Sequence, residues 1–431
     1  MQILALLGGE PIISKKAQRN NTIGQEEIDA VLDVLRSGVL SKFLGCWDGD
    51  FYGGPKIQAL ERAWENYFNI KYAIAINSAT SGLIAALGAI GIEPGDEVIV
   101  SPWTMCASAT SILMWNAIPV FADIESETFN LDPQSVRQNI TEYTKAIVVS
   151  DIFGHPAQLD EIMQIAKEYN LKVIEDAAQA PGAFYKNQYA GTVADIGVFS
   201  LNYHKHIHTG EGGICVTNDA NLAERMQLIR NHAEAVVGGK EVSDLSNMIG
   251  FNFRMTEIEA AIGITQLKKL AALANVKQKI AMQLDDGLRG LIGLRCPITR
   301  EGCSHVFYVY PLLLDSKLLS ISRRTIVKAL IAEGITGLAQ GYCNLHRLPL
   351  YQKKIAYGKS GFPWKSPFYK GNVSYRKGIC SVAEDYYDNK YFGIEICLYQ
   401  YTKHDVDLIV QAFHKVWNHL DQLKNFSLCG E

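Results

Sequence analysis

One lysine stands among three histidines in the stretch FSLNYHKHIHTGEGG, residues 199–213. Lys205 lies between His204 and His206, His208 follows, and a glycine-rich turn comes next. Lysine forms Schiff bases with carbonyl groups when its surroundings lower its pKa, and nearby cationic groups have that effect. A surface lysine is the ordinary alternative, and the residues alone give the two interpretations about equal weight.

A carboxylate follows an apolar run in the stretch VIEDAAQ, residues 173–179. Asp176 stands just past the strand expected over Lys172–Glu175. A buried aspartate costs several kcal/mol unless it meets a cation or strong donors, and a protonated pyridine nitrogen is such a partner. The N-cap of a short alanine-rich turn is the structural alternative, with equal weight.

Small and hydroxylated residues form the stretch NSATSG, residues 77–82, between an expected strand and an expected helix. Backbone N–H groups, the hydroxyls of Ser78, Thr80 and Ser81, and the helix N-terminus would all favour a bound phosphate. Such caps also precede many helices for purely structural reasons. Together the three stretches supply a phosphate site, a carboxylate for a ring nitrogen and an amine for an aldehyde. Those are the groups that pyridoxal 5'-phosphate requires.

The sequence gives less support to other cofactor sites and to other nucleophiles. No GxGxxG follows a strand and no GxxxxGK[ST] occurs, so neither a dinucleotide fold nor a P-loop is predicted. A cysteine nucleophile with a histidine partner stays open, although no cysteine has a suggestive context. Nine cysteines without a CxxC pair predict reduced thiols in a cytoplasm and no metal site.

The composition is that of an ordinary globular protein. Hydrophobic residues make up 48% and charged residues 20% of 431 residues, a length that predicts two domains. The net charge is −4 and no run of like charges stands out, so no nucleic-acid or membrane-surface partner is expected. No segment approaches the ~18 apolar residues of a membrane span. We therefore expect a soluble cytoplasmic protein.

The elements that position the three stretches follow an alternating pattern of strands and helices from about residue 71 to 218. This pattern predicts an α/β fold with a mostly parallel sheet, whose ligands bind beyond the carboxyl ends of the strands. Seven strands are expected, at Tyr72–Ile76, Glu97–Val100, Pro119–Asp123, Lys145–Ser150, Lys172–Glu175, Ile196–Leu201 and Gly213–Thr217.

The pattern changes after Asn252. Residues Met255–Leu270 have a 3.6-residue apolar period and predict a long helix, and the segments beyond it predict a smaller α+β domain. Asn344–Tyr375 is rich in glycine, proline and aromatic residues and predicts an irregular loop. A boundary near residue 270 would divide the chain into a large domain with an N-terminal arm, 1–270, and a small domain, 271–431.

Eight sequence segments, spread over nearly the whole chain, resemble those of a known protein family. They are LALLGGEPI, GGPKIQALERAWENYF, NSATSGLIAAL, EPGDEVIVSPWT, IPVFADIESETFNLDP, KVIEDAAQAPGA, FSLNYHKHIHTGEGG and FNFRMTEIEAAIG. With them the chain resembles the DegT/DnrJ/EryC1/StrS aminotransferases. The resemblance implies a fold-type I pyridoxal-phosphate-dependent transferase that aminates keto-sugars of nucleotide sugars or related cyclitols.

The resemblance also implies roles for residues around the cofactor ring. Lys205 occupies the family's Schiff-base position, and Asp176 matches the aspartate that pairs with the pyridinium nitrogen. Gln179 matches the polar neighbour beside the ring oxygen.

Further roles concern the phosphate and the subunit interface. Ala79 and Thr80 match the small residue and the hydroxyl that hold the phosphate, and Ser200 matches a serine that contacts it. Asn252 lies where the family's second subunit reaches across to the phosphate. The resemblance therefore implies a homodimer with a shared active site.

Three positions depart from the family's pattern. His206 replaces a common asparagine, and Asp151 stands where histidine is common. The residue that stacks on the ring is usually aromatic, and Met105 fills a position that often is. We expect Trp103 to stack on the ring instead. These changes bear on the substrate more than on the cofactor chemistry.

The expected reaction moves an amino group from L-glutamate onto a keto-sugar, foremost a nucleotide-linked one. A keto-sugar phosphate or an inosose-like cyclitol is the alternative, because the arm LALLGGEPI resembles the branch that contains cyclitol enzymes. A sugar dehydratase is less favoured, because those relatives have histidine in place of the lysine. In the Asn344–Tyr375 loop, residues such as His346, Lys353, Lys354 and Trp364 would either line the acceptor site or form a solvated loop.

Overall fold

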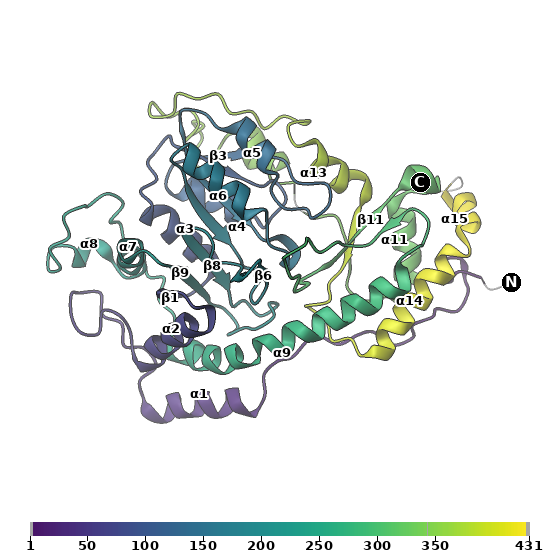
Figure 1. Cartoon of the computed structure of the whole chain (residues 1–431), viewed down its shortest axis with the longest axis horizontal. Coiled ribbons are helices and arrows are strands. Elements are labelled where there is room, and N and C mark those ends of the chain that lie inside the picture. The colour runs from purple at the N-terminus through teal and green to yellow at the C-terminus, as the bar shows by residue number, and fades with distance from the viewer. Residues whose placement is uncertain (1–2, 343, 428–431) are drawn as a thin grey trace.

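Seven strands form the larger sheet of the computed structural model, which describes residues 3–342 and 344–427 (Figure 1). Six of these strands are parallel to one another, and β9 alone runs antiparallel to its neighbours. The mostly parallel seven-stranded sheet expected from the sequence is confirmed. Across the sheet the order is β1 (Tyr72–Ile76), β9 (Gly213–Thr217), β8 (Ile196–Ser200), β5 (Lys172–Asp176), β4 (Thr144–Ser150), β2 (Glu97–Val100) and β3 (Ile118–Phe121).

Helices cover both faces of this sheet, because its strands are apolar on both faces. In β1, Ile74 and Ile76 contribute to one core, and Ala73 and Ala75 contribute to another. The helices on the first face are α3 (Ala79–Ala89), α4 (Cys106–Met114) and α7 (Ala220–Arg230). Those on the second face are α2 (Pro55–Phe68), α5 (Pro133–Asn139), α6 (Leu159–Glu168) and the first half of α9 (Glu257–Leu288).

Helix α9 connects the larger sheet with the smaller domain (Figure 1). It begins with a capping box, in which Thr256 and Glu259 exchange side-chain to backbone hydrogen bonds. Residues up to Leu270 pack against the large sheet, and residues from Ile280 onward belong to the smaller core. The boundary expected near residue 270 therefore falls inside one continuous helix.

The smaller domain is an antiparallel sheet covered by helices. Leu4 of the N-terminal arm packs into its core, so the arm contacts this domain as well. The sheet order is β10 (Leu294–Arg295), β11 (Tyr310–Leu314), β13 (Tyr391–Ile394) and β12 (Leu338–Gln340), and the main helices are α11 (Arg323–Ala332), α14 (Lys403–Trp417) and α15 (Leu420–Ser427). Within residues 3–342 and 344–427, none of the helices combines the length and apolar character needed to cross a bilayer.

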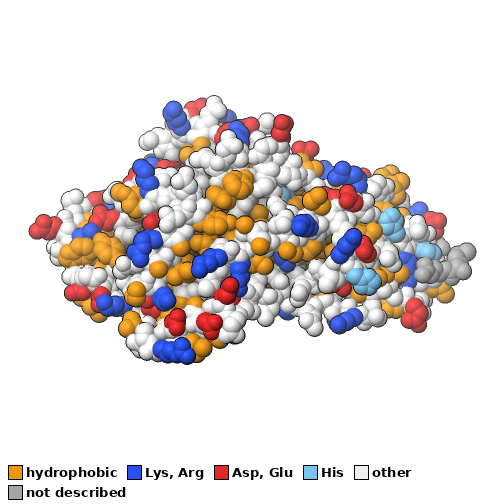
Figure 2. Space-filling model, turned by 60° about the horizontal axis from the view of Figure 1, so that its bottom comes forward, with side chains coloured by type: hydrophobic (Ala, Val, Ile, Leu, Met, Phe, Trp, Pro, Cys, Tyr) orange, Lys and Arg blue, Asp and Glu red, His pale blue; other side chains and the backbone are white. Residues whose placement is uncertain are grey.

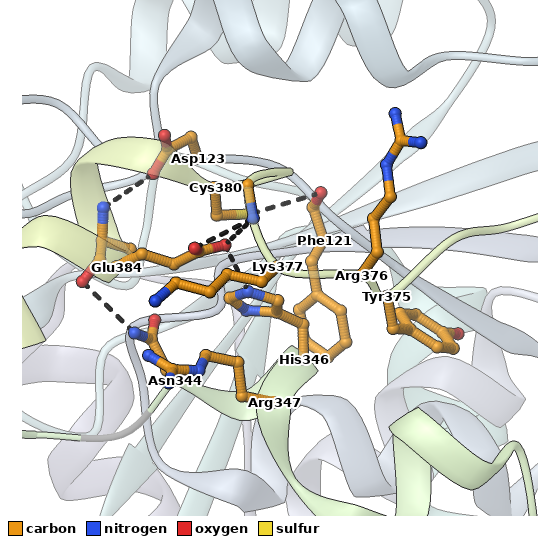
Figure 3. Close-up of polar contacts among 12 residues, drawn as sticks. Phe121, Asp123, Asn344, His346, Arg347, Tyr375, Arg376, Lys377, Cys380 and Glu384 are labelled. Atoms are coloured by element: carbon orange, nitrogen blue, oxygen red, sulfur yellow. Dashed lines mark hydrogen bonds and ion pairs between the residues drawn. The ribbon is translucent and has the colours of Figure 1, made fainter. Parts of the chain in front are cut away.

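Residues 344–386, between β12 and β13, return to the large sheet and pack along its edge strand β3 (Figure 3). The hydroxyl of Tyr375 donates to the backbone oxygen of Pro119 at 2.7 Å, and the backbone N–H groups of Val382 and Ala383 donate to Asp123. An edge strand exposes unpaired backbone groups, so this cover protects the sheet.

Two side chains that were expected to line an acceptor site or lie in solvent are buried in this packing. His346 points toward Glu384 (Figure 3), and its Nε2 lies 2.9 Å from Oε1 of that residue. Trp364 donates its indole N–H to the hydroxyl of Tyr375. Lys354 donates to the backbone oxygen of Val373. Each of these three side chains therefore makes a polar contact within the fold.

Candidate active site

A cavity of about 160 Å³ lies beyond the carboxyl ends of β4, β5 and β8, beside the first turn of α3. Ligand sites of parallel sheets occur at this edge. The cavity brings together six of the eight predicted site residues, and leaves out Trp103 and Asn252. The six are Ala79, Thr80, Asp176, Gln179, Ser200 and Lys205.

One end of the cavity is rich in hydrogen-bond donors. Ser78 caps α3 by accepting the backbone N–H of Ser81 at 3.1 Å. The N–H groups of Ala79 and Thr80, in the first turn, have no acceptor within the helix. Ser200 adds a hydroxyl at the end of β8. This combination suits a phosphate group, because the helix dipole also favours an anion there.

Gly213 makes the close packing of this end possible. A Cβ atom at this position would lie 2.7 Å from the backbone nitrogen of Ala79 and 2.7 Å from the carbonyl carbon of Ser78. Only glycine therefore lets β9 approach the first turn of α3. The glycine-rich turn singled out in the sequence thus supports the phosphate end.

Asp176 ends β5 and is 7% exposed. Its Oδ2 accepts the hydroxyl of Ser108 at 2.7 Å, and its Oδ1 accepts the backbone N–H of Ala178 at 3.3 Å. Burial raises the pKa of Asp176, whereas Ser108, Ala178 and the Lys205 amine lower it. A cation placed in the cavity would favour the ionised carboxylate further. The residue therefore suits a protonated ring nitrogen.

Gln179 is held in place from two sides. Its Oε1 accepts the backbone N–H of Phe153 at 2.8 Å, and its Nε2 donates to the hydroxyl of Tyr342 at 3.0 Å. Phe153 has a left-handed backbone with φ of 59°, a conformation that non-glycine residues rarely adopt. The side chain of Gln179 thus connects the large sheet with a residue next to the smaller one.

Lys205 is 9% exposed and lines the cavity. Burial lowers the pKa of Lys205 to about 8, although Asp176 and Cys397 raise it. The amine lies 4.4 Å from the centre of the Tyr308 ring, a cation–π distance. A larger fraction of the amine is therefore neutral near pH 7 than in an ordinary lysine.

The neighbouring histidines are not the cationic groups that were expected to lower the pKa of Lys205. Burial lowers the pKa of both His204 and His206 to about 4, so both are neutral near pH 7. The ring of His206 contacts the backbone oxygen of Val306 at 2.9 Å. Burial, and not a cationic neighbour, is therefore the main cause of the lowered pKa of Lys205.

Trp103 does not line the cavity, which corrects the expectation that it stacks on the ring. Its side chain is fully buried and packs against Phe129, Tyr342 and Tyr391. The residues after β2 that line the cavity include Thr104 and Met105, and Met105 is 57% exposed. Aromatic residues from distant parts of the chain surround the indole, and this packing keeps it away from the cofactor end.

Asn252 is exposed and lies outside the cavity of its own chain. Its Oδ1 accepts the Nε–H of Arg254 at 2.7 Å, and its backbone pairs with Asn231. This position is compatible with the expected role across a subunit interface, which stays a prediction.

Four residues near the cavity were not predicted. Ser108 contacts Asp176, Tyr308 contacts Lys205, and Tyr342 contacts Gln179. All three are distant in sequence from the groups they touch, and no motif marked them. The fourth is Glu175, which pairs with Asp151.

Asp151 and Glu175 form a buried carboxyl pair next to the cavity. Both side chains are at most 1% exposed. Glu175 accepts the backbone N–H groups of Gly191, Val193 and Ala194. Burial raises the pKa of Asp151 well above its usual range, and the Glu175 carboxylate raises it further. Burial raises the pKa of Glu175 too, but its three backbone donors lower it, so we expect a proton shared by the pair to reside on Asp151.

A solved structure shares this architecture. An aminotransferase from Psychrobacter cryohalolentis matches with a TM-score of 0.79 and 28% identity, over 94% of this chain and 100% of that one. The fold and the lysine, aspartate and helix N-terminus in one cavity define a pyridoxal-phosphate-dependent aminotransferase.

The chain belongs to the DegT/DnrJ/EryC1/StrS aminotransferase family, whose model matches residues 21–382. Spore coat polysaccharide biosynthesis protein SpsC of Bacillus subtilis is 34% identical over 358 residues, 82% of this chain and 89% of that protein. GDP-perosamine synthase of Caulobacter vibrioides is 39% identical over 286 residues, 65% of this chain and 75% of that protein. The resemblance inferred from the sequence is confirmed.

Proposed function

We propose that the protein transfers an amino group from L-glutamate to a keto-sugar carried on a nucleotide. The observation that carries the proposal is the cavity in which Lys205 and Asp176 lie together beside the N-terminus of α3. The names of two relatives support the acceptor class, since one refers to polysaccharide biosynthesis and the other to a GDP-linked sugar.

The side chains of the cavity fit pyridoxal phosphate, which, when bound, supplies an aldehyde for amines and a ring that takes up electrons. Thr80, Ser200 and the N–H groups that begin α3 would hold its phosphate. Asp176 would pair with the ring nitrogen, and Gln179 would lie beside the ring oxygen.

Lys205 has two tasks in the proposed reaction. Its Nζ would hold the cofactor and, once an amino donor has freed it, would accept the proton from the donor's Cα. A pKa of about 8 suits this task, because a general base works best when its pKa lies near the working pH. In the second half-reaction the same amine would deliver a proton to the sugar carbon that gains the amino group. Because the keto acid leaves before the keto-sugar binds, we expect ping-pong kinetics.

We also propose a homodimer in which Asn252 of one subunit reaches the phosphate end of the other subunit's cavity. Hydrophobic side chains gather on the face that Figure 2 brings forward, and exposed apolar residues are frequent on α1 (Gln25–Ser37) and in the loop after it. Contiguous exposed apolar surface marks interaction sites. The exposed residues of this region are Ile28, Leu32, Leu35, Val39, Leu40, Leu44 and Trp47.

The test uses the purified protein with added pyridoxal phosphate. We expect L-glutamate to change the cofactor absorbance and to yield 2-oxoglutarate. A panel of nucleotide-linked keto-sugars, keto-sugar phosphates and inosose-like cyclitols then identifies the acceptor by product mass. Lys205→Ala should lower turnover at least about a thousandfold. Amination of only a sugar phosphate or a cyclitol would show that the proposed nucleotide linkage is wrong.

A further inference from the structure

A second cavity, of about 280 Å³, lies against Lys205. Both Lys205 and His204 line this cavity as well as the first one, so the catalytic amine borders both. The second cavity is formed by the loop around the lysine, the N-terminal arm and the segment after β13. Its side chains include Arg19, Tyr203, His208 and Cys397.

Among the described residues, those that line the second cavity include basic side chains and no acidic ones. Arg19 and Lys205 are its basic residues, its histidines have lowered pKa values, and no carboxylate is among its lining residues. A carboxylate would therefore be attracted to the second cavity.

The arm and the smaller domain fix the position of Arg19. The backbone of Arg19 pairs with Tyr399, and its guanidinium carbon lies 4.9 Å from the centre of the Tyr399 ring. The neighbouring Asn20 donates its backbone N–H to Leu398 at 3.0 Å. A stacked guanidinium keeps its N–H groups at the edge, where they can bind a carboxylate with two hydrogen bonds.

No carboxylate of the described residues forms an ion pair with Arg19. Glu395 lies near enough for Arg19 to lower its pKa, against the effect of burial, but the two side chains form no ion pair in residues 3–342 and 344–427. The guanidinium of Arg19 thus remains available to a ligand.

We propose that Arg19 binds a carboxylate of the amino donor while the donor's amine approaches Lys205 from the second cavity. The proposal rests on the proposed function and deepens it, because it names the residue that selects an amino acid as donor. Every amino-acid donor carries the carboxylate that this site requires.

The experiment measures the donor half-reaction alone, by the change in cofactor absorbance at increasing L-glutamate concentrations. For Arg19→Gln we expect the half-saturating glutamate concentration to rise at least tenfold, because a charged hydrogen-bonded contact is lost. Arg19→Lys should give a smaller rise. Lys16→Gln, which removes an exposed charge from the same arm, should behave as the wild type.

A binding measurement gives a second readout. Glutarate has the carboxylates of glutamate but no amine, so it binds without reacting. Calorimetry with the cofactor-loaded protein should show at least tenfold weaker glutarate binding for Arg19→Gln and no change for Lys16→Gln. The thermal unfolding of the variants checks that they are folded.

The outcomes separate the two proposals. If the wild type does not react with glutamate, the proposed donor is wrong. If the wild type reacts and Arg19→Gln shows the same glutamate dependence, the inference about Arg19 is wrong. It is equally wrong if the substitution slows only the reaction with the keto-sugar.

Discussion

The hydroxyl of Ser108, in the first turn of α4, donates a 2.7 Å hydrogen bond to Oδ2 of Asp176 at the end of β5. Both side chains are buried. The bond favours the ionised form of a carboxyl group whose pKa burial raises. Ser108 thereby helps to keep Asp176 negative for a ring nitrogen.

Ser108→Ala should weaken the enzyme without removing any group that touches the substrate. Loss of the donor raises the pKa of Asp176 further, so the carboxylate holds a protonated ring nitrogen less well. We expect roughly a tenfold fall in kcat, measured with glutamate and the keto-sugar acceptor. Ser111→Ala is the matched control, because Ser111 donates to the backbone of Ser108 and not to Asp176. Equal effects of both substitutions would contradict this role.

The carboxyl pair gives a prediction about which side chain holds the proton. Asp151→Asn should change the free energy of unfolding by less than about 1 kcal/mol, because an amide replaces a neutral acid of similar shape. Glu175→Gln should cost at least about 2 kcal/mol, because its NH₂ group would face backbone N–H donors. Chemical denaturation of both variants tests this. The reverse order of stabilities would assign the proton to Glu175.

The lowered pKa of Lys205 predicts how the stability of the cofactor-free protein depends on pH. Burial lowers this pKa from 10.5 in the unfolded chain to about 8, so between these values the unfolded state binds more protons. Stability should therefore rise with pH across this window, by up to about 3 kcal/mol. Below pH 8 the full cost of burying the charge is present.

Lys205→Met removes this titration and is the variant for the measurement. Denaturation curves from pH 6 to 10.5 should rise less steeply for the variant than for the wild type. Near pH 7 the variant should be the more stable protein when no cofactor is present. Parallel curves would mean that Lys205 titrates alike in both states.

Gly213→Ala should damage the phosphate end of the cavity. The added methyl group would meet the backbone of Ser78 and Ala79 at 2.7 Å, and backbone atoms cannot move aside as a flexible side chain can. We expect a loss of about 1–3 kcal/mol in stability and at least tenfold weaker pyridoxal phosphate binding, measured by fluorescence titration. Gly238→Ala, which has open space around it, should change neither quantity.

Most of the site could be predicted from the sequence, because the positions of its residues follow from the order of strands and helices along the chain. Each of Thr80, Asp176 and Ser200 lies at the end of a strand or the start of a helix, and parallel strands bring these positions to one edge. The order of strands and helices could not show where the Trp103 side chain points. Whether Trp103 or Met105 faces the cavity depends on packing with aromatic residues such as Tyr342 and Tyr391, which belong to the other domain.

The sequence by itself determined the parallel sheet, the family and the lysine–aspartate pair, because apolar periodicity and short motifs are local properties of the chain. Only the tertiary structure decided which groups surround that pair. It placed Ser108 on Asp176, joined Asp151 to Glu175, and brought Arg19 from the N-terminal arm beside Lys205. These contacts join residues far apart in the chain, and burial sets their charges, so no local pattern could reveal them.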